Sequence, residues 1–279
     1  MSPNERPIWG CLLSLVVAAG TVGCGDSTGV GGPQNVALNF RVTSSSALQL
    51  IRASGPALAS GPSTVAGAPM TIEGTNGTLK IEEIRLIVAE VELEGEDDGC
   101  DDLVPGVDDC ADFEAPPRFI DLPLDGQPIE AFVGLIPPGT YTELEFEIED
   151  LEDDEDDPEL ASAITALRAD ILAQIPEWPW EASGMVVGTF DSPSSGVVRF
   201  RVFLEAEIEI ERDLIPNLVV GADGSASVDL TVDVRPDLWF LRPDGSVIPL
   251  HLFDYDLTGR LLEFELEMEN GFTEIEIES

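Results

Sequence analysis

The amino-acid sequence predicts a mainly β protein, an antiparallel β-sandwich built as two packed sandwiches or one extended sandwich, with one amphipathic helix between the halves. Apolar residues alternate with glutamates in segments such as 143–149 and 204–211, the period of a strand with one buried face. Turn residues separate these segments, as in antiparallel all-β proteins. Helix and strand patterns do not alternate along the chain, which argues against a parallel α/β sheet.

The first residues predict export from the cytoplasm. Leu12–Gly20 is an apolar run, too short for a membrane span of about 20 residues, and the small-residue site Thr21-Val22-Gly23-Cys24 follows it. This pattern resembles the signal of bacterial lipoproteins, which implies cleavage before Cys24 and acylation of that cysteine.

We therefore expect a signal peptide at residues 1–23, and at 24–34 the lipidated Cys24 with a flexible tether rich in glycine. The resemblance places the chain in the bacterial cell envelope, attached to the outer membrane by its acyl chains. A plain secretory signal is the alternative interpretation.

Residues 35–157 are expected to form an N-terminal β-sandwich. Val36–Val42 has the alternation of a strand. Asn76-Gly77 is a hairpin-turn signal, and residues 79–93 after it suit one long strand. The adjacent Glu82 and Glu83 interrupt the alternation of this strand and predict a β-bulge.

Residues 119–151 predict strand, turn and strand, with Pro137-Pro138-Gly139 as the turn. Pro138 has a fixed φ, and Gly139 is expected to take the positive φ that the third position of a type II turn requires. The buried side of the second strand is expected to carry Leu144, Phe146 and Ile148.

This turn carries a resemblance to a known group of proteins. Leu135, Pro137, Gly139, Thr140 and Tyr141, preceded by Asp121-Leu122, resemble the prealbumin-like (transthyretin-like or Cna-B-like) sandwich repeats of bacterial surface proteins. They are most similar to surface lipoproteins of a domain-of-unknown-function family. The resemblance implies a prealbumin-like or Ig-like β-sandwich and no particular activity, because a fold does not fix a function.

Cys100 and Cys110 are left as a natural pair once Cys11 leaves with the signal and Cys24 takes the lipid. In an oxidising compartment they are expected to form a disulfide. Carboxylates on both sides of this pair offer oxygen ligands for calcium, although EF-hand spacing is absent, and a solvated acidic loop is the alternative. The candidate calcium ligands are Asp97, Asp98, Asp101, Asp102, Asp108, Asp109 and Asp112.

Residues 158–183 are expected to form a helix and a connector. Asp157 suits the N-cap and Pro158 the first helical position, and Pro176 ends the helix. Trp178-Pro179-Trp180 then predicts either a plug between helix and sheet, which we favour, or a platform for sugar stacking. The apolar face of the helix is formed by Leu160, Ile164, Leu167, Ile171 and Ile175.

Residues 184–279 are expected to form a C-terminal antiparallel β domain, with turns at 221–224 and 243–245. Its last segment, 262–277, suits a hairpin that turns at Asn270-Gly271. That register places Glu265 opposite Glu276, and Arg199 and Arg201 are the expected basic neighbours of the pair.

No catalytic constellation stands out in the sequence. His251 is the lone histidine, and Asp254-Tyr255-Asp256 is the nearest approach to an acid–base pair. The net charge of −42 repels phosphate backbones and argues against nucleic acid as a partner.

These residues predict a non-catalytic, acidic lipoprotein of the cell envelope. It would act as a binding or structural module, with an envelope protein or a glycan as partner and its acyl anchor as the contact with the membrane. The alternatives are a calcium- or cation-binding structural module and a glycan-binding or adhesion domain. No cofactor is expected apart from calcium.

Overall fold

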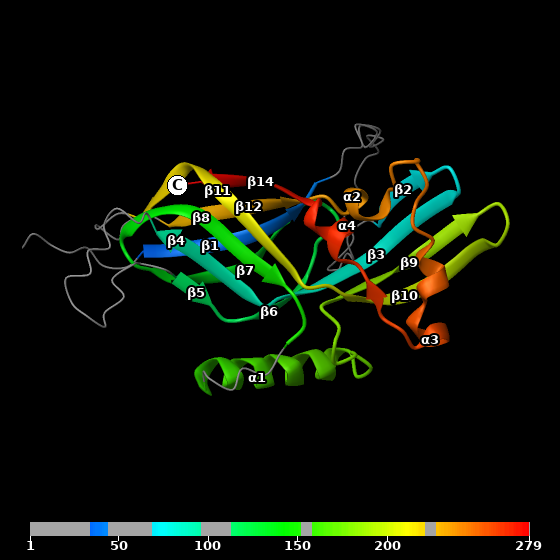
Figure 1. The fold of residues 1–279 in the computed structure, drawn as a ribbon, viewed down its shortest axis with the longest axis horizontal. Coiled ribbons are helices and arrows are strands. Elements are labelled where there is room, and N and C mark those ends of the chain that lie inside the picture. The colour runs from blue at the N-terminus through cyan, green and yellow to red at the C-terminus, as the bar shows by residue number, and fades with distance from the viewer. Residues whose placement is uncertain (1–33, 44–68, 96–112, 152–157, 221–226, 279) are drawn as a thin grey trace, which may run out of the picture. The chain divides into compact units, whose positions relative to one another are not determined.

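The computed structural model describes residues 34–43, 69–95, 113–151, 158–220 and 227–278, and all of them belong to one compact unit. The described chain is mainly β, which confirms the predicted fold class, and its strands form three sheets (Figure 1). Cys24, Cys100, Cys110 and the candidate calcium ligands between Asp97 and Asp112 lie outside the described residues, as does the expected turn at 221–224.

Three sheets contain the strands. Sheet A has the order β14 (Phe272–Glu278), β12 (Val228–Val234), β1 (Gln34–Val42) and β7 (Pro128–Ile136). Sheet B has the order β13 (Leu262–Glu263), β10 (Gly196–Glu205), β9 (Gly184–Ser192), β3 (Gly77–Val88) and β2 (Met70–Gly74), and β6 (Arg118–Asp121) also pairs with β3. Sheet C has the order β11 (Ile208–Val220), β8 (Gly139–Ile148), β4 (Glu90–Gly95) and β5 (Phe113–Ala115).

Sheets A and C pack face to face as a sandwich. Their inner faces share one apolar core, in which Phe146 of sheet C lies 5.2 Å from Phe40 and 5.2 Å from Phe272, both of sheet A, between ring centroids. Edge-to-face aromatic contacts of this kind add to the free energy of burial.

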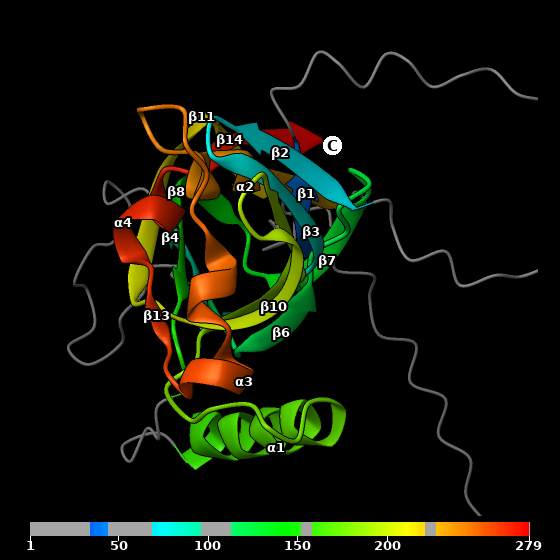
Figure 2. The same cartoon turned by 90° about the vertical axis from the view of Figure 1, so that its right-hand side faces the viewer.

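Helices pack on both faces of sheet B. One face packs on the segment that contains α2 (Pro236–Phe240) and the 3-10 helix η3 (Leu250–Phe253). Part of the other face meets α1 (Pro158–Gln174), which lies along one side of the molecule in both ribbon views (Figures 1 and 2). Two short helices, α3 (Tyr255–Thr258) and α4 (Glu265–Glu269), follow η3 in the chain.

The predicted helix is confirmed as α1. Ile164 and Ile171 of its apolar face are buried with Ile87 of β3, and Leu160 and Leu167 pack against them. The predicted plug is Trp178: its ring packs edge-on against Phe119 and Phe203, at 5.1 and 5.3 Å between centroids. Its indole N–H donates to the carbonyl of Ala182 at 3.0 Å.

The expected division of the chain into consecutive β regions does not describe the sheets. Each sheet combines strands from 35–157 with strands from 184–279. In sheet A, β1 lies between β7 and β12, and it pairs with β12 in parallel. A second parallel pair joins β10 and β13. The hydrogen bonds that form the sheets therefore connect the two ends of the sequence.

The long strand expected at 79–93 is two strands. β3 pairs with β9 and β6 in sheet B, and β4 pairs with β8 and β5 in sheet C, with Ala89 between them. The predicted hairpin before it is confirmed, because β2 and β3 pair from Gly74 and Gly77 outward. The predicted bulge is also confirmed, since the register with β9 shifts between Ile81 and Glu83.

The turn at Pro137-Pro138-Gly139 does not make a hairpin. β7 before it belongs to sheet A and β8 after it belongs to sheet C, so the chain crosses from one layer of the sandwich to the other. Gly139 is not one of the described glycines with positive φ, so the type II turn is wrong. Tyr141 is fully buried at the crossing, and its hydroxyl donates to the carbonyl of Pro137 at 2.9 Å.

The prediction of a C-terminal hairpin over residues 262–277 is also wrong. Residues 265–269 form α4 in place of a strand, and β14 pairs antiparallel with β12. Phe264 and Met268 are buried in the main core, and Phe264 stacks on Phe240 at 5.3 Å.

Glu276 therefore faces Thr231 and does not face Glu265. Its basic neighbour is Arg41, whose guanidinium lies 3.0 Å from Glu276 and 2.7 Å from Asp233. Arg199 and Arg201, the expected neighbours, pair elsewhere: Arg199 with Glu82, and Arg201 with Glu177 and Asp256.

Candidate functional site: an acidic sheet face

The outer face of sheet C is formed by carboxylates. Along β4, β8 and β11 the alternate residues that point inward are apolar and buried, for example Leu93, Phe146 and Ile210. Because successive side chains of a strand point to opposite faces, the glutamates between them point outward. Register decides which of them become neighbours.

Cross-strand pairing arranges ten carboxylates in three rows, which we call the acidic face. The first row is Glu90, Glu147 and Glu209. The middle row is Glu114, Glu92, Glu145 and Glu211. The third row is Glu94, Glu143 and Asp213.

No described residue at these register positions is basic. Arg212 of β11 pairs with Leu144, so it belongs to the opposite side of the strand. Its guanidinium donates to the carbonyls of Glu211 and Phe272, at 2.7 Å each. Like charges directly opposite each other destabilise a sheet, so the facing carboxylates of this face repel one another.

Three carboxylates of the acidic face come close enough to share a cation. Oxygens of Glu145, Glu147 and Glu209 all lie within 4.8 Å of one another. Calcium binds six to eight oxygens at about 2.3–2.6 Å, and carboxylates can each supply one or two of them. The cluster therefore has the donor type, and part of the donor number, that calcium requires.

The crowding raises several pKa values. Partial burial and the charges of Glu209, Glu92, Glu147 and Glu211 raise the pKa of Glu145 to about 7. Partial burial, and then Glu209, raise the pKa of Glu147. The pKa of Glu211 is raised first by its hydrogen bond with Glu209. Each raised pKa means that ionisation of the carboxyl group is less favourable in the folded protein than in water.

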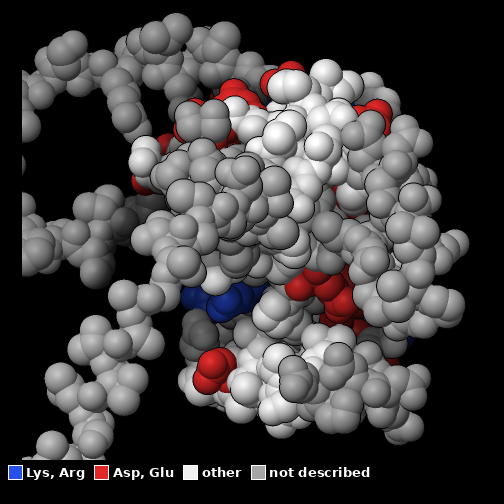
Figure 3. Space-filling model, turned by 90° about the vertical axis from the view of Figure 1, so that its left-hand side faces the viewer, with Lys and Arg blue, Asp and Glu red and all other residues white. Residues whose placement is uncertain are grey.

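Acidic side chains also occupy other parts of the surface. Viewed from one end of the molecule, Asp and Glu are visible in several places, and Lys and Arg cover a smaller area (Figure 3).

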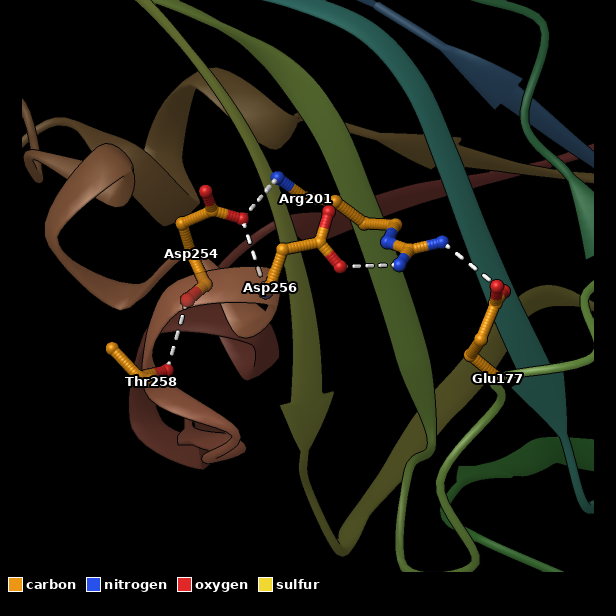
Figure 4. Close-up of polar contacts among 5 residues, drawn as sticks. All are labelled: Glu177, Arg201, Asp254, Asp256 and Thr258. Atoms are coloured by element: carbon orange, nitrogen blue, oxygen red, sulfur yellow. Dashed lines mark hydrogen bonds and ion pairs between the residues drawn. The ribbon is translucent and has the colours of Figure 1, made fainter.

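Asp254 and Asp256, the candidate acid–base pair, have a structural role. The Asp254 carboxylate accepts from the backbone N–H of Arg201 at 3.2 Å and of Asp256 at 3.4 Å, which caps α3 (Figure 4). Asp256 pairs with the Arg201 guanidinium at 2.5 Å, and Glu177 approaches the same guanidinium at 3.4 Å (Figure 4). These contacts fasten α3 and the segment after α1 to β10.

His251 packs against an aromatic ring. Its imidazole stacks on Phe190 with 4.7 Å between centroids and 9° between ring planes. This contact matches the structural role expected of a lone histidine on an apolar segment.

The acidic face could not be recognised as a site from the sequence. The alternating glutamates of segments 143–149 and 204–211 are visible there, but the candidate cation ligands predicted from the sequence lie between Asp97 and Asp112, outside the described residues. The missing information was the order of the strands. Glu92, Glu145 and Glu211 come from three distant segments, and only the register of sheet C aligns them.

Comparison with protein-family models, with curated proteins and with solved structures found no match to this chain. The resemblance to surface lipoproteins therefore stays a prediction. Among the described residues, no helix is both long and apolar enough to cross a membrane.

Proposed function

We propose that this chain is a non-catalytic, acidic lipoprotein of the bacterial cell envelope, anchored through Cys24, and that its acidic face is a binding surface for divalent cations. The observation that carries this proposal is the cluster of Glu145, Glu147 and Glu209, with oxygens within 4.8 Å of one another. A bound cation would offset the repulsion between the carboxylates that the register of sheet C places opposite one another.

Calcium is the first cation to test. Extracellular calcium modules bind with dissociation constants of about 0.1–1 mM, so millimolar calcium suits an envelope protein. A ligand that binds only the folded state at 100 times its dissociation constant stabilises it by about 2.7 kcal/mol. Cation binding should therefore be measurable as a rise in melting temperature.

The experiment is a calcium titration of the whole chain at constant ionic strength, with NaCl replaced stepwise by CaCl2. We expect the melting temperature of the wild type to rise and that of Glu145→Gln to rise much less. Glu274→Gln is the matched control, because Glu274 is exposed on β14 of sheet A, away from the acidic face. If 10 mM calcium, about ten times the weakest of these dissociation constants, does not raise the melting temperature of the wild type, the cation proposal is contradicted. If calcium raises the melting temperature of Glu145→Gln as much as that of the wild type, the cation binds at another site.

The glycan-binding alternative has less support. It depends on aromatic faces open to a sugar ring, and Trp178 is used as a plug. Trp180 is exposed, but the guanidinium of Arg168 already lies 3.1 Å above the centroid of its ring. We therefore favour cations over sugars as the ligand of this module.

A further inference from the structure

A small cavity lies between the C-terminal half of α1 and sheet B. Its volume is about 120 Å³. Its floor is formed by Ile87, Leu151 and Ile171, which are all buried. Leu172 and Trp180 are at its rim, where they are 43% and 60% exposed. Two large apolar side chains thus remain open to solvent around an apolar hollow.

Among the described residues that line the cavity, Arg168 is the only one with a charged side chain. Its guanidinium donates to the carbonyl of Leu151 and covers one face of Trp180. The other lining side chains are aliphatic, proline or tryptophan, so a ligand would find almost no side-chain partners for its own polar groups. Polar groups that lose water without gaining hydrogen bonds are costly to bury.

The wall formed by Trp178 is held in place before any ligand arrives. Its ring is fixed by edge contacts with Phe119 and Phe203 and by the hydrogen bond to Ala182. A rigid wall lowers the ordering cost of binding. Apolar cavities of similar size, about 150 Å³, stay dry and accept benzene.

We propose that this cavity binds a small neutral aromatic ring, about as large as toluene. The ring would occupy the apolar space over Ile87 and Ile171, with its edge or face toward Trp178 and Trp180. The proposal is independent of the acidic face, because no residue of that face lines the cavity.

The test uses toluene as the probe and the melting temperature of the whole chain as the readout, with glucose at the same concentration as the comparison. For a chain of this size, near-saturating toluene should raise the melting temperature by about 2–4 °C. Trp180→Ala should lose most of this rise, while Trp180→Phe, which keeps an aromatic ring, should retain it. Leu257→Ala is the control for an exposed apolar residue on α3, outside the cavity.

Four outcomes would overturn the proposal. In the first, toluene does not change the melting temperature of the wild type, and in the second, Trp180→Ala keeps the full rise. In the third, Trp180→Phe or Leu257→Ala loses the rise. In the fourth, glucose raises the melting temperature as much as toluene does. The last outcome would instead support a sugar site at Trp180.

Discussion

Glu145 illustrates how neighbours change the chemistry of a single residue. It lies in the middle row of the acidic face, between Glu92 of β4 and Glu211 of β11. Partial burial and these carboxylates, together with Glu209 and Glu147, raise its pKa to about 7. An unfolded chain keeps a glutamate pKa near 4.3, so folding makes ionisation of this residue less favourable.

This shift predicts that the protein becomes more stable as the pH falls. The pKa of Glu145 is higher in the folded than in the unfolded state, so its stabilising contribution is complete below about pH 4.3. That contribution is lost as the pH rises through about 7. Since the group is only partly buried, we expect an effect of about 1 kcal/mol.

Glu145→Gln should therefore raise the free energy of unfolding at pH 8 by about 1 kcal/mol and change it little at pH 4. The measurement is urea denaturation at both pH values with a chelator present, and Glu274→Gln serves as the control. A Gln variant that is less stable than the wild type at pH 8 would show that Glu145 is not under repulsion.

At the scale of elements, the junction between α4 and β14 depends on close packing. Gly271 follows α4, and a Cβ on it would lie 1.7 Å from the indole nitrogen of Trp239. Trp239 is only 1% exposed, so its ring has little room to move.

Gly271→Ala is expected to lower the free energy of unfolding by about 1–3 kcal/mol, the usual cost of overpacking a core. The measurement is urea denaturation followed by tryptophan fluorescence, which also reports the displacement of Trp239. Glu269→Ala, at an exposed position of the same element, should change stability by less than about 0.5 kcal/mol. Equal effects of the two substitutions would refute the close contact with Trp239.

For the whole molecule, the prediction concerns its attachment to the membrane. The apolar run and the small-residue site before Cys24 predict a mature chain that begins with an acylated cysteine. Mass spectrometry of the protein extracted from membranes should find this N-terminal species, and Cys24→Ser should release the chain from the membrane fraction. Recovery of wild type as a soluble chain with a free N-terminus beyond Cys24 would refute the anchor.

Much of the local structure could be predicted from the sequence. The alternation in 143–149 identified β8, and the spacing of Ile164 and Ile171 identified α1. These signals are reliable because they reflect burial of one face over a few consecutive residues. They also fixed which side chains of each strand point away from the core.

The tertiary structure decided which strands are neighbours. Pairing joins segments far apart in the chain, such as β1 with β12 and β8 with both β4 and β11, and nothing in the local pattern specifies a partner. For the same reason the turn at Pro137 could be predicted but the crossing between sheets could not, since a turn after a strand does not say which sheet receives the next strand. The acidic face exists only through this pairing, because alternation places each glutamate outward but strand order alone sets the carboxylates side by side.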